Sequence, residues 1–175
     1  MFLSKTCTIE DCTKRWKLDG TESIKQLSGS TNINNGVMSG GSAFLLDGID
    51  NTVDWKLELD VLFSSYGGCG VQLTPPSATS RGYRCLKINS SGAYNHNNDS
   101  YNDTSNGVFP TPSTDTWYSV VFRKQNNGIS AEFNGTTINC TRWSYINNSQ
   151  ICVGVDYWSS HGEYCSIKNL RLKPL

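Results

Sequence analysis

The sequence predicts an all-β protein, an antiparallel β-sandwich of the jelly-roll type. Two observations support this prediction: apolar and polar residues alternate in many short runs, and turn-forming Gly, Pro, Asn and Asp residues separate those runs. Helical periodicity is nearly absent, since only residues 14–27 could form a turn or two of helix and Gly20 interrupts them. Many short, half-apolar strands are typical of two sheets that pack face to face.

The most regular strand is WKLELDVLF at residues 55–63. Successive side chains of a strand point to opposite faces, so Lys56, Glu58 and Asp60 share one face and the apolar residues share the other. We expect the apolar face to lie in the core, and it comprises Trp55, Leu57, Leu59, Val61 and Phe63.

The clearest hairpin follows at residues 117–135. Asn127-Gly128 predicts a tight turn with positive φ, and Asn134-Gly135 predicts a second turn. Alternation assigns one apolar face to the two strands, made of Tyr118, Val120, Phe122, Ile129, Ala131 and Phe133. Other runs that read as strands lie at 43–48, 70–76, 84–89, 93–97, 151–158 and 165–175.

The sequence also predicts two irregular features. Alternation fails between Ile167 and Leu170, which predicts a bulge near residues 168–169. Residues 97–115 are polar and read as a long loop. With 175 residues and no repeat or linker, we expect one domain, in which a strand and turn region at 1–36 packs on a core at 37–173.

The charge balance excludes two classes of partner. Fifteen basic and fifteen acidic residues give a formal net charge of zero, whereas nucleic acid and anionic membranes need a basic face. No run approaches the roughly 18 apolar residues of a membrane helix, so we expect no membrane insertion. Only 17% of residues are charged, and Asn, Ser, Thr and Gly take their place. Such a surface suits neutral ligands such as sugars, although an AT-rich genome explains the asparagines equally well.

Seven cysteines favour disulfides on an extracellular or virion surface. None forms C-x-x-C and only two histidines exist, which argues against a structural zinc site. The connectivity stays open; pairing by proximity gives Cys7–Cys12, Cys69–Cys85 and Cys140–Cys152, with one cysteine free or joined to another chain. The first residues contain no apolar signal-peptide core, so export as part of a virion or of a larger parent chain is expected, and a homo-oligomer would form through that parent assembly.

These runs, in this order, resemble the concanavalin A-like lectin/glucanase superfamily, especially its laminin-G-like modules. The resemblance covers about residues 37–173 and rests on SGGSAFLLDGID, WKLELDVLF, TWYSVVFRKQNNGISAEFNGT and ICVGVDYW with CSIKNLRL. It implies a β-sandwich jelly roll that agrees with the strand and turn chemistry. Modules of this kind are found in adhesin-like proteins and in phage or virus receptor-binding proteins.

The laminarinase-type hydrolases of this superfamily carry E-x-D-x-x-E or E-x-D-x-E on one strand. The first glutamate is the nucleophile and the last is the acid/base, and retaining hydrolysis needs both carboxyl groups. Glu58 and Asp60 match the first two positions, but the third falls on Leu62 or Phe63. We therefore interpret the stretch as structural and the protein as not an enzyme. A thiol enzyme built on Cys165 and His161 is disfavoured because no oxyanion device is evident.

Aromatic residues among polar neighbours are the candidate ligand-binding residues. Sugar rings stack on flat aromatic side chains, while their hydroxyls need amide, carboxylate or hydroxyl partners. One member of each Trp/Tyr pair could instead be core. The candidates are Trp143, Tyr145, Asp156, Tyr157, Trp158, His161, Tyr94 and Tyr101. No catalytic residue, metal site or cofactor is assigned; calcium, common in the superfamily, would draw on Asp99, Asp103 and Asp115, which no spacing rule selects.

The sequence therefore predicts a non-catalytic, lectin-like binding module that recognises a host or cell-surface glycan. A viral, phage-type tail protein used in host attachment, or a microbial adhesin, is the expected context. Two alternatives stay open: a glycoside hydrolase-like enzyme or its accessory carbohydrate-binding domain, and a structural or protein-binding laminin-G-like module.

Overall fold

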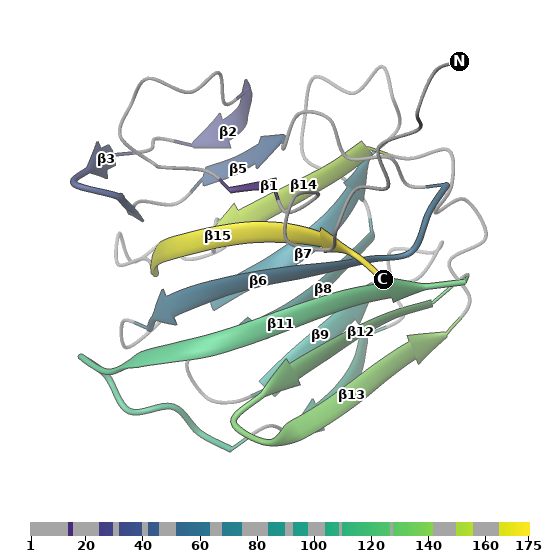
Figure 1. Cartoon of the computed structure of the whole chain (residues 1–175). Helices are drawn as coiled ribbons and strands as arrows, with labels where there is room; N and C mark the ends of the chain where they lie inside the picture. The colour runs from purple at the N-terminus through teal and green to yellow at the C-terminus, as the bar shows by residue number, and fades with distance from the viewer. Residues whose placement is uncertain are drawn as a thin grey trace, which may run out of the picture.

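The computed structural model contains two antiparallel sheets packed face to face, and its described residues form strands and turns without any helix (Figure 1). The predicted antiparallel β-sandwich is therefore confirmed. The structure describes residues 14–15, 25–29, 32–39, 42–45, 52–63, 68–74, 84–89, 93–97, 104–108, 110–126, 128–141, 150–155 and 165–175. Within these ranges no helix is long and apolar enough to cross a membrane.

The front sheet, drawn nearest the viewer in Figure 1, is built around the central strand β6. Its strands in spatial order are β13 (Thr136–Thr141), β12 (Gly128–Phe133), β11 (Trp117–Gln125), β6 (Trp55–Leu62), β15 (Ser166–Pro174), β4 (Val37–Ser39) and β3 (Asn32–Asn34). A short strand, β1 (Lys14–Arg15), also pairs with β15. The first described strand and the last strand of the chain thus lie side by side in one sheet.

The back sheet lies behind it and contains the remaining strands. Their spatial order is β10 (Thr104–Val108), β9 (Ala93–Asn97), β8 (Arg84–Asn89), β7 (Gly68–Thr74), β14 (Gln150–Val155), β5 (Ser42–Leu45) and β2 (Lys25–Gly29). Every pairing in both sheets is antiparallel.

The inner face of the front sheet supplies the described part of the core. All five apolar residues predicted for β6 and the residue after it are at most 2% exposed, and Val120, Phe122, Ala131 and Phe133 are fully buried. The rings of Phe63, Tyr118 and Phe133 pack together, with centroids 5.3 to 6.3 Å apart. Such burial contributes roughly 1.5–3 kcal/mol for each large side chain. The predicted alternation of β6 and β11 is confirmed.

The turn between β11 and β12 lies one residue earlier than the sequence predicts. Gln125 pairs with Gly128, so the two loop residues are Asn126 and the residue after it, and Gly128 already begins β12. Asn126 adopts a φ of 53°, a conformation that asparagine tolerates. Its backbone N–H donates to Asp54 Oδ1 at 2.9 Å, so the residue just before β6 fixes the turn. By contrast, Asn134 and Gly135 have φ of 47° and 78°, as the second predicted turn requires.

The bulge in β15 is confirmed, because the register with β6 shifts between Lys168 and Arg171. Asn169 sits there with a φ of 54°. Residues 14–15 and 25–29, where the sequence allowed a turn or two of helix, are strand. The prediction of a loop at residues 97–115 is wrong in part, because residues 104–108 form strand β10, which pairs with β9. Backbone pairing with a neighbouring strand overrides weak local propensity in each of these segments.

The strand register also bears on the cysteines. Cys69 pairs with Ile88 while Cys85 pairs with Gln72, so the two cysteines are three positions out of register. That offset is roughly 10 Å along the strands, beyond the reach of a disulfide. The proximity pairing Cys69–Cys85 is therefore wrong. Cys165 is fully buried.

One charged residue enters the core at the end of the sandwich. Lys124 is 2% exposed, and its ammonium donates to Asp54 Oδ1 at 3.1 Å. This hydrogen bond, against the opposing effect of burial, holds the pKa of Asp54 below its ordinary value. Asp54 thus neutralises Lys124 and also anchors Asn126, which ties the start of β6 to the end of β11.

We expect Asp54→Ala to lower the free energy of unfolding by about 1–3 kcal/mol, because it leaves the buried Lys124 ammonium without its carboxylate. Lys124→Met should cost less, since it removes the charge and keeps an apolar stem of similar length. Urea denaturation of both variants measures the difference. If Lys124→Met were the more damaging change, the ion pair itself would stabilise this end of the sheet.

Candidate functional site on the outer face of the front sheet

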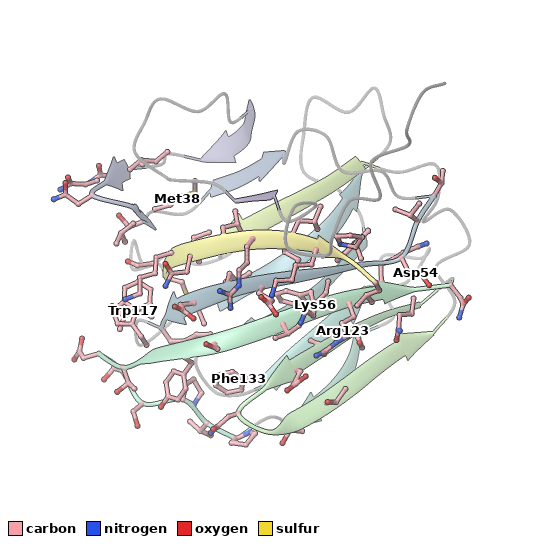
Figure 2. All side chains as sticks on the ribbon, viewed as in Figure 1. Met38, Asp54, Lys56, Trp117, Arg123 and Phe133 are labelled. Carbon is pink, nitrogen blue, oxygen red and sulfur yellow. The ribbon has the colours of Figure 1, made fainter. Side chains whose placement is uncertain are left out.

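The outer face of the front sheet carries the polar side chains of β6, β11 and β15. Figure 2 shows Trp117 at one end of this sheet and Asp54 at the other, with Lys56 and Arg123 between them. Because the strands are antiparallel and in register, the outward side chains form rows across the sheet. The first row joins Arg123, Lys56 and Lys173, and we call it the cation row.

The next row holds Glu58, which is surrounded by cations. Lys56 Nζ lies 2.6 Å from Glu58 Oε1 and Lys173 Nζ lies 3.2 Å from Oε2, which also accepts from Arg171 Nε. The Glu58 side chain is only 12% exposed. Burial opposes ionisation, but the hydrogen bonds from Lys56, Lys173 and Arg171 outweigh it and lower the pKa of Glu58 to about 2. Glu58 is therefore ionised throughout the physiological range.

Asp60 lies one row further along β6 and has neutral partners. Ser119 Oγ donates to Asp60 Oδ1 at 2.8 Å, and Asn169 Nδ2 donates to Oδ2 at 2.6 Å. The bulge in β15 matters here, because it turns the positive-φ residue Asn169 toward β6. These three residues, from three strands, form a fixed group of amide, hydroxyl and carboxylate that we call the Asp60 cluster.

An aromatic residue ends this face. Trp117 pairs with Leu62 on β6 and is partly exposed, and Lys168 Nζ lies 3.9 Å from the centroid of its ring. At the other side of the sheet, Arg123 Nη1 is 2.7 Å from Glu132 Oε2 on β12. The face thus combines an aromatic ring, a hydrogen-bonding cluster and a charged zone within a few strands.

The geometry answers whether Glu58 and Asp60 are the start of a hydrolase triad. Leu62 follows them on the same face, and Phe63 is buried in the core at 1% exposure. Neither side chain can transfer a proton. On β6, β11 and β15 no further described carboxyl group shares the outer face with them. The interpretation of this stretch as a strand with two acids on its outer face agrees with the contacts of both acids.

The candidate residues chosen from the sequence lie almost entirely outside the described residues. Only Tyr94 falls within them, as a backbone position of β9 paired with Ile88 and Gly107. The other seven, Trp143, Tyr145, Asp156, Tyr157, Trp158, His161 and Tyr101, lie outside, so they stay predictions.

The sequence analysis did not select the residues of this outer face as candidate ligand-binding residues. Their signal was present in the sequence, because the same alternation that puts Tyr118 and Val120 inside puts Trp117 and Ser119 outside. The partners on β15 could not be found in this way, since they depend on the bulge and on strand pairing.

No metal site emerges from the described side chains, which contain no group of three or more His, Cys, Asp or Glu residues able to hold an ion. Of the three aspartates considered for calcium, Asp115 is exposed in a turn with a φ of 59°. Asp99 and Asp103 lie outside the described residues.

Comparison with known proteins identifies the fold. No family model matches the chain. No curated protein matches it in sequence. Among solved structures it is similar to the carbohydrate-binding module CBM66 from Bacillus subtilis, with a TM-score of 0.61 and 11% identity, covering 88% of this chain and 97% of that one. It is also similar to the exoplasmic/lumenal domain of VIP36, in its calcium- and Man3GlcNAc-bound form, with a TM-score of 0.64 and 9% identity over 94% and 88% of the two chains.

An enzyme is also among these structures. Trypanosoma rangeli sialidase matches with a TM-score of 0.54 and 9% identity over 82% of this chain, but over only 26% of its own. The protein thus has the concanavalin A-like jelly-roll fold, as the resemblance implied. At these identities the likeness establishes the fold, and the ligand must be argued from the residues.

The low pKa of Glu58 makes stability depend on pH in a defined direction. Its charged form is favoured by folding, so the stabilisation is fully present above the ordinary pKa of 4.5 and is lost as the pH falls toward about 2. Glu58→Gln should lower the free energy of unfolding at pH 7 by roughly 1–3 kcal/mol, allowing for solvent screening of its partners.

Urea titrations of wild type and Glu58→Gln at pH 7, 4.5 and 2.5 should show two curves that converge as the pH falls. Glu132→Gln is the matched control, because that side chain is 40% exposed and pairs with a single arginine. A constant difference between wild type and Glu58→Gln at all three pH values would contradict the assigned cause of the pKa shift.

Proposed function

We propose that this protein is a non-catalytic module that binds a cell-surface glycan. The observation that carries the proposal is the outer face of the front sheet, where hydrogen-bonding side chains from three strands hold one another in place beside the partly exposed ring of Trp117. This face presents the hydroxyl of Ser119, the carboxylate of Asp60 and the amide of Asn169. Trp117 lies in the next row along the sheet, opposite Leu62. Sugars need this mixture, since each ring offers hydroxyls at its edge and an apolar C–H face.

Preorganisation supports recognition rather than catalysis at this face. Asp60 is held by two donors and Glu58 by three cations, so neither carboxylate is poised to attack a substrate or to deliver a proton. Side chains already fixed in the free protein lose little conformational entropy when a ligand binds. A module of this design keeps its ligand unchanged, and we therefore propose that it has no enzymatic activity.

The proposed context is attachment to a surface, in a viral receptor-binding protein of the phage type or in a microbial adhesin that acts outside the cell. An uncharged polar composition and seven cysteines support this context. The similar structures support it in part, since one is a carbohydrate-binding module and another is recorded with Man3GlcNAc bound.

A glycan array of microbial surface polysaccharides and animal glycans tests the proposal. We expect a specific ligand whose binding falls about tenfold or more with Trp117→Ala if the outer face is the site. Trp117→Phe keeps an aromatic ring and serves as the control for folding. Loss of binding with Trp143→Ala or Trp158→Ala, but not with Trp117→Ala, would move the site to the aromatic residues chosen from the sequence. A folded protein that binds no glycan would overturn the proposal in favour of a protein receptor or an architectural role.

A further inference from the structure

The cation row is an unusual arrangement for a sheet face. Arg123, Lys56 and Lys173 are direct cross-strand partners on β11, β6 and β15, and like charges in that relation destabilise a sheet. Arg171 adds a fourth cation in the neighbouring row, opposite Glu58. If these residues only stabilised the sheet, we would expect positive and negative side chains to alternate across the three strands.

The carboxylates within this zone do not balance the cations. Glu132 pairs with Arg123, and Glu58 is shared among Lys56, Lys173 and Arg171. Two carboxylates thus face four cations, which leaves two positive charges in excess among the described side chains. Asp60 and Lys168 occupy opposite positions on β6 and β15 and carry opposite charges, so together they add no net charge to the face. Lys124, which pairs with Asp54, is buried in the core and does not belong to this face.

The depth of the side chains directs the excess charge outward. Glu58 is the most buried member at 12% exposure, whereas Lys56, Arg123, Lys173 and Arg171 are 24%, 26%, 29% and 42% exposed. Each ammonium carries three N–H donors and each guanidinium five, so Glu58 beneath the cations and the more exposed Glu132 beside Arg123 use only part of this capacity. The remaining donors face solvent on an open sheet surface, in the region where Figure 2 labels Lys56 and Arg123.

We propose that the cation row, with Arg171, binds the anionic group of an acidic polysaccharide, a carboxylate or a sulfate carried on successive sugars. This inference rests on the proposed function and names the class of its ligand. Three strands set the cations at intervals of about 4.8 Å, so that the row spans roughly 10 Å. Arginine binds such planar or tetrahedral anions through paired N–H groups. The neutral Asp60 cluster and Trp117 lie beside the row, where adjoining sugar hydroxyls and ring faces would make contact.

Charge distinguishes this ligand from nucleic acid. The chain has no net charge, and Glu58 and Glu132 lie among the cations. A phosphate backbone of high charge density favours a broad basic surface free of carboxylates. A chain with one carboxylate or sulfate per sugar has a lower charge density than duplex DNA and fits a small excess of positive charge interspersed with acceptors.

The test compares polymers that share a backbone and differ in charge, using isothermal titration calorimetry on the whole chain. Polygalacturonate and its methyl ester provide the carboxylate pair, and a sulfated and a desulfated galactan provide the sulfate pair. We expect binding to one charged polymer, weakening as NaCl rises from 50 to 500 mM, and little binding to the uncharged partners.

Two variants of opposite sign make the test specific. Arg123→Gln should weaken binding about three- to tenfold, and Glu132→Gln should strengthen it by a similar factor, since the first removes a positive and the second a negative charge from one exposed ion pair. Both lose the same ion pair, so a purely structural effect would move them in the same direction. Urea midpoints confirm that each variant is folded.

Each outcome decides something. Equal binding of charged and uncharged polymers, or no effect of either variant on a glycan that does bind, overturns this inference and leaves the proposed function standing. Equal affinity for duplex DNA overturns the assignment to a saccharide. The absence of binding to every glycan, with the protein folded, overturns both.

Discussion

The register of β6 between β11 and β15 is the constraint on which the rest of the structure depends. Every second residue of β6 is buried against the back sheet, and every other one carries polar or charged groups outward. A slip of one residue would expose Trp55 and bury Glu58, at a cost in both apolar burial and desolvated charge. The pairing that packs the core is therefore the same pairing that places Arg123 and Lys173 beside Lys56. The same strand pairing therefore determines both the core on the inner face of the sheet and the candidate site on its outer face.

The two carboxylates of β6 show how environment decides what an acid does. Glu58 and Asp60 are spaced as in a hydrolase strand, yet one is neutralised by three cations and the other holds a serine and an asparagine. The low pKa of Glu58 keeps it charged, so it orders its neighbours at every physiological pH. A general acid/base needs a pKa close to the working pH, so Glu58 is unsuited to that role; in the hydrolase pattern its position is that of the nucleophile. The contacts that fix these two carboxylates also organise the polar surface around them.

Local pattern predicted a large part of this structure and a smaller part of the site. Alternation located β6, β11 and β12, correctly assigned the inner faces of β6 and β11 and the inward positions of Ala131 and Phe133, and put Glu58 and Asp60 outside. The failure of alternation in β15 located its bulge. The turn after β11 was misplaced by one residue because Asp54, more than seventy positions away, binds Asn126. Strand β10 was missed because its residues have no alternation and its order comes from pairing with β9.

The sequence by itself determined which side chains point inward and which outward, because alternation is a property of each strand alone. It also determined that no proton-transferring residue follows Glu58 and Asp60 at the hydrolase spacing. Only the tertiary structure decided which outward residues become neighbours: Ser119 reaches Asp60 across 59 positions, and Arg171 reaches Glu58 across 113. Contacts at such separations follow from strand order and from the bulge in β15. Basic and acidic residues are equal in number along the chain, but strand pairing brings three of the basic residues together in the cation row.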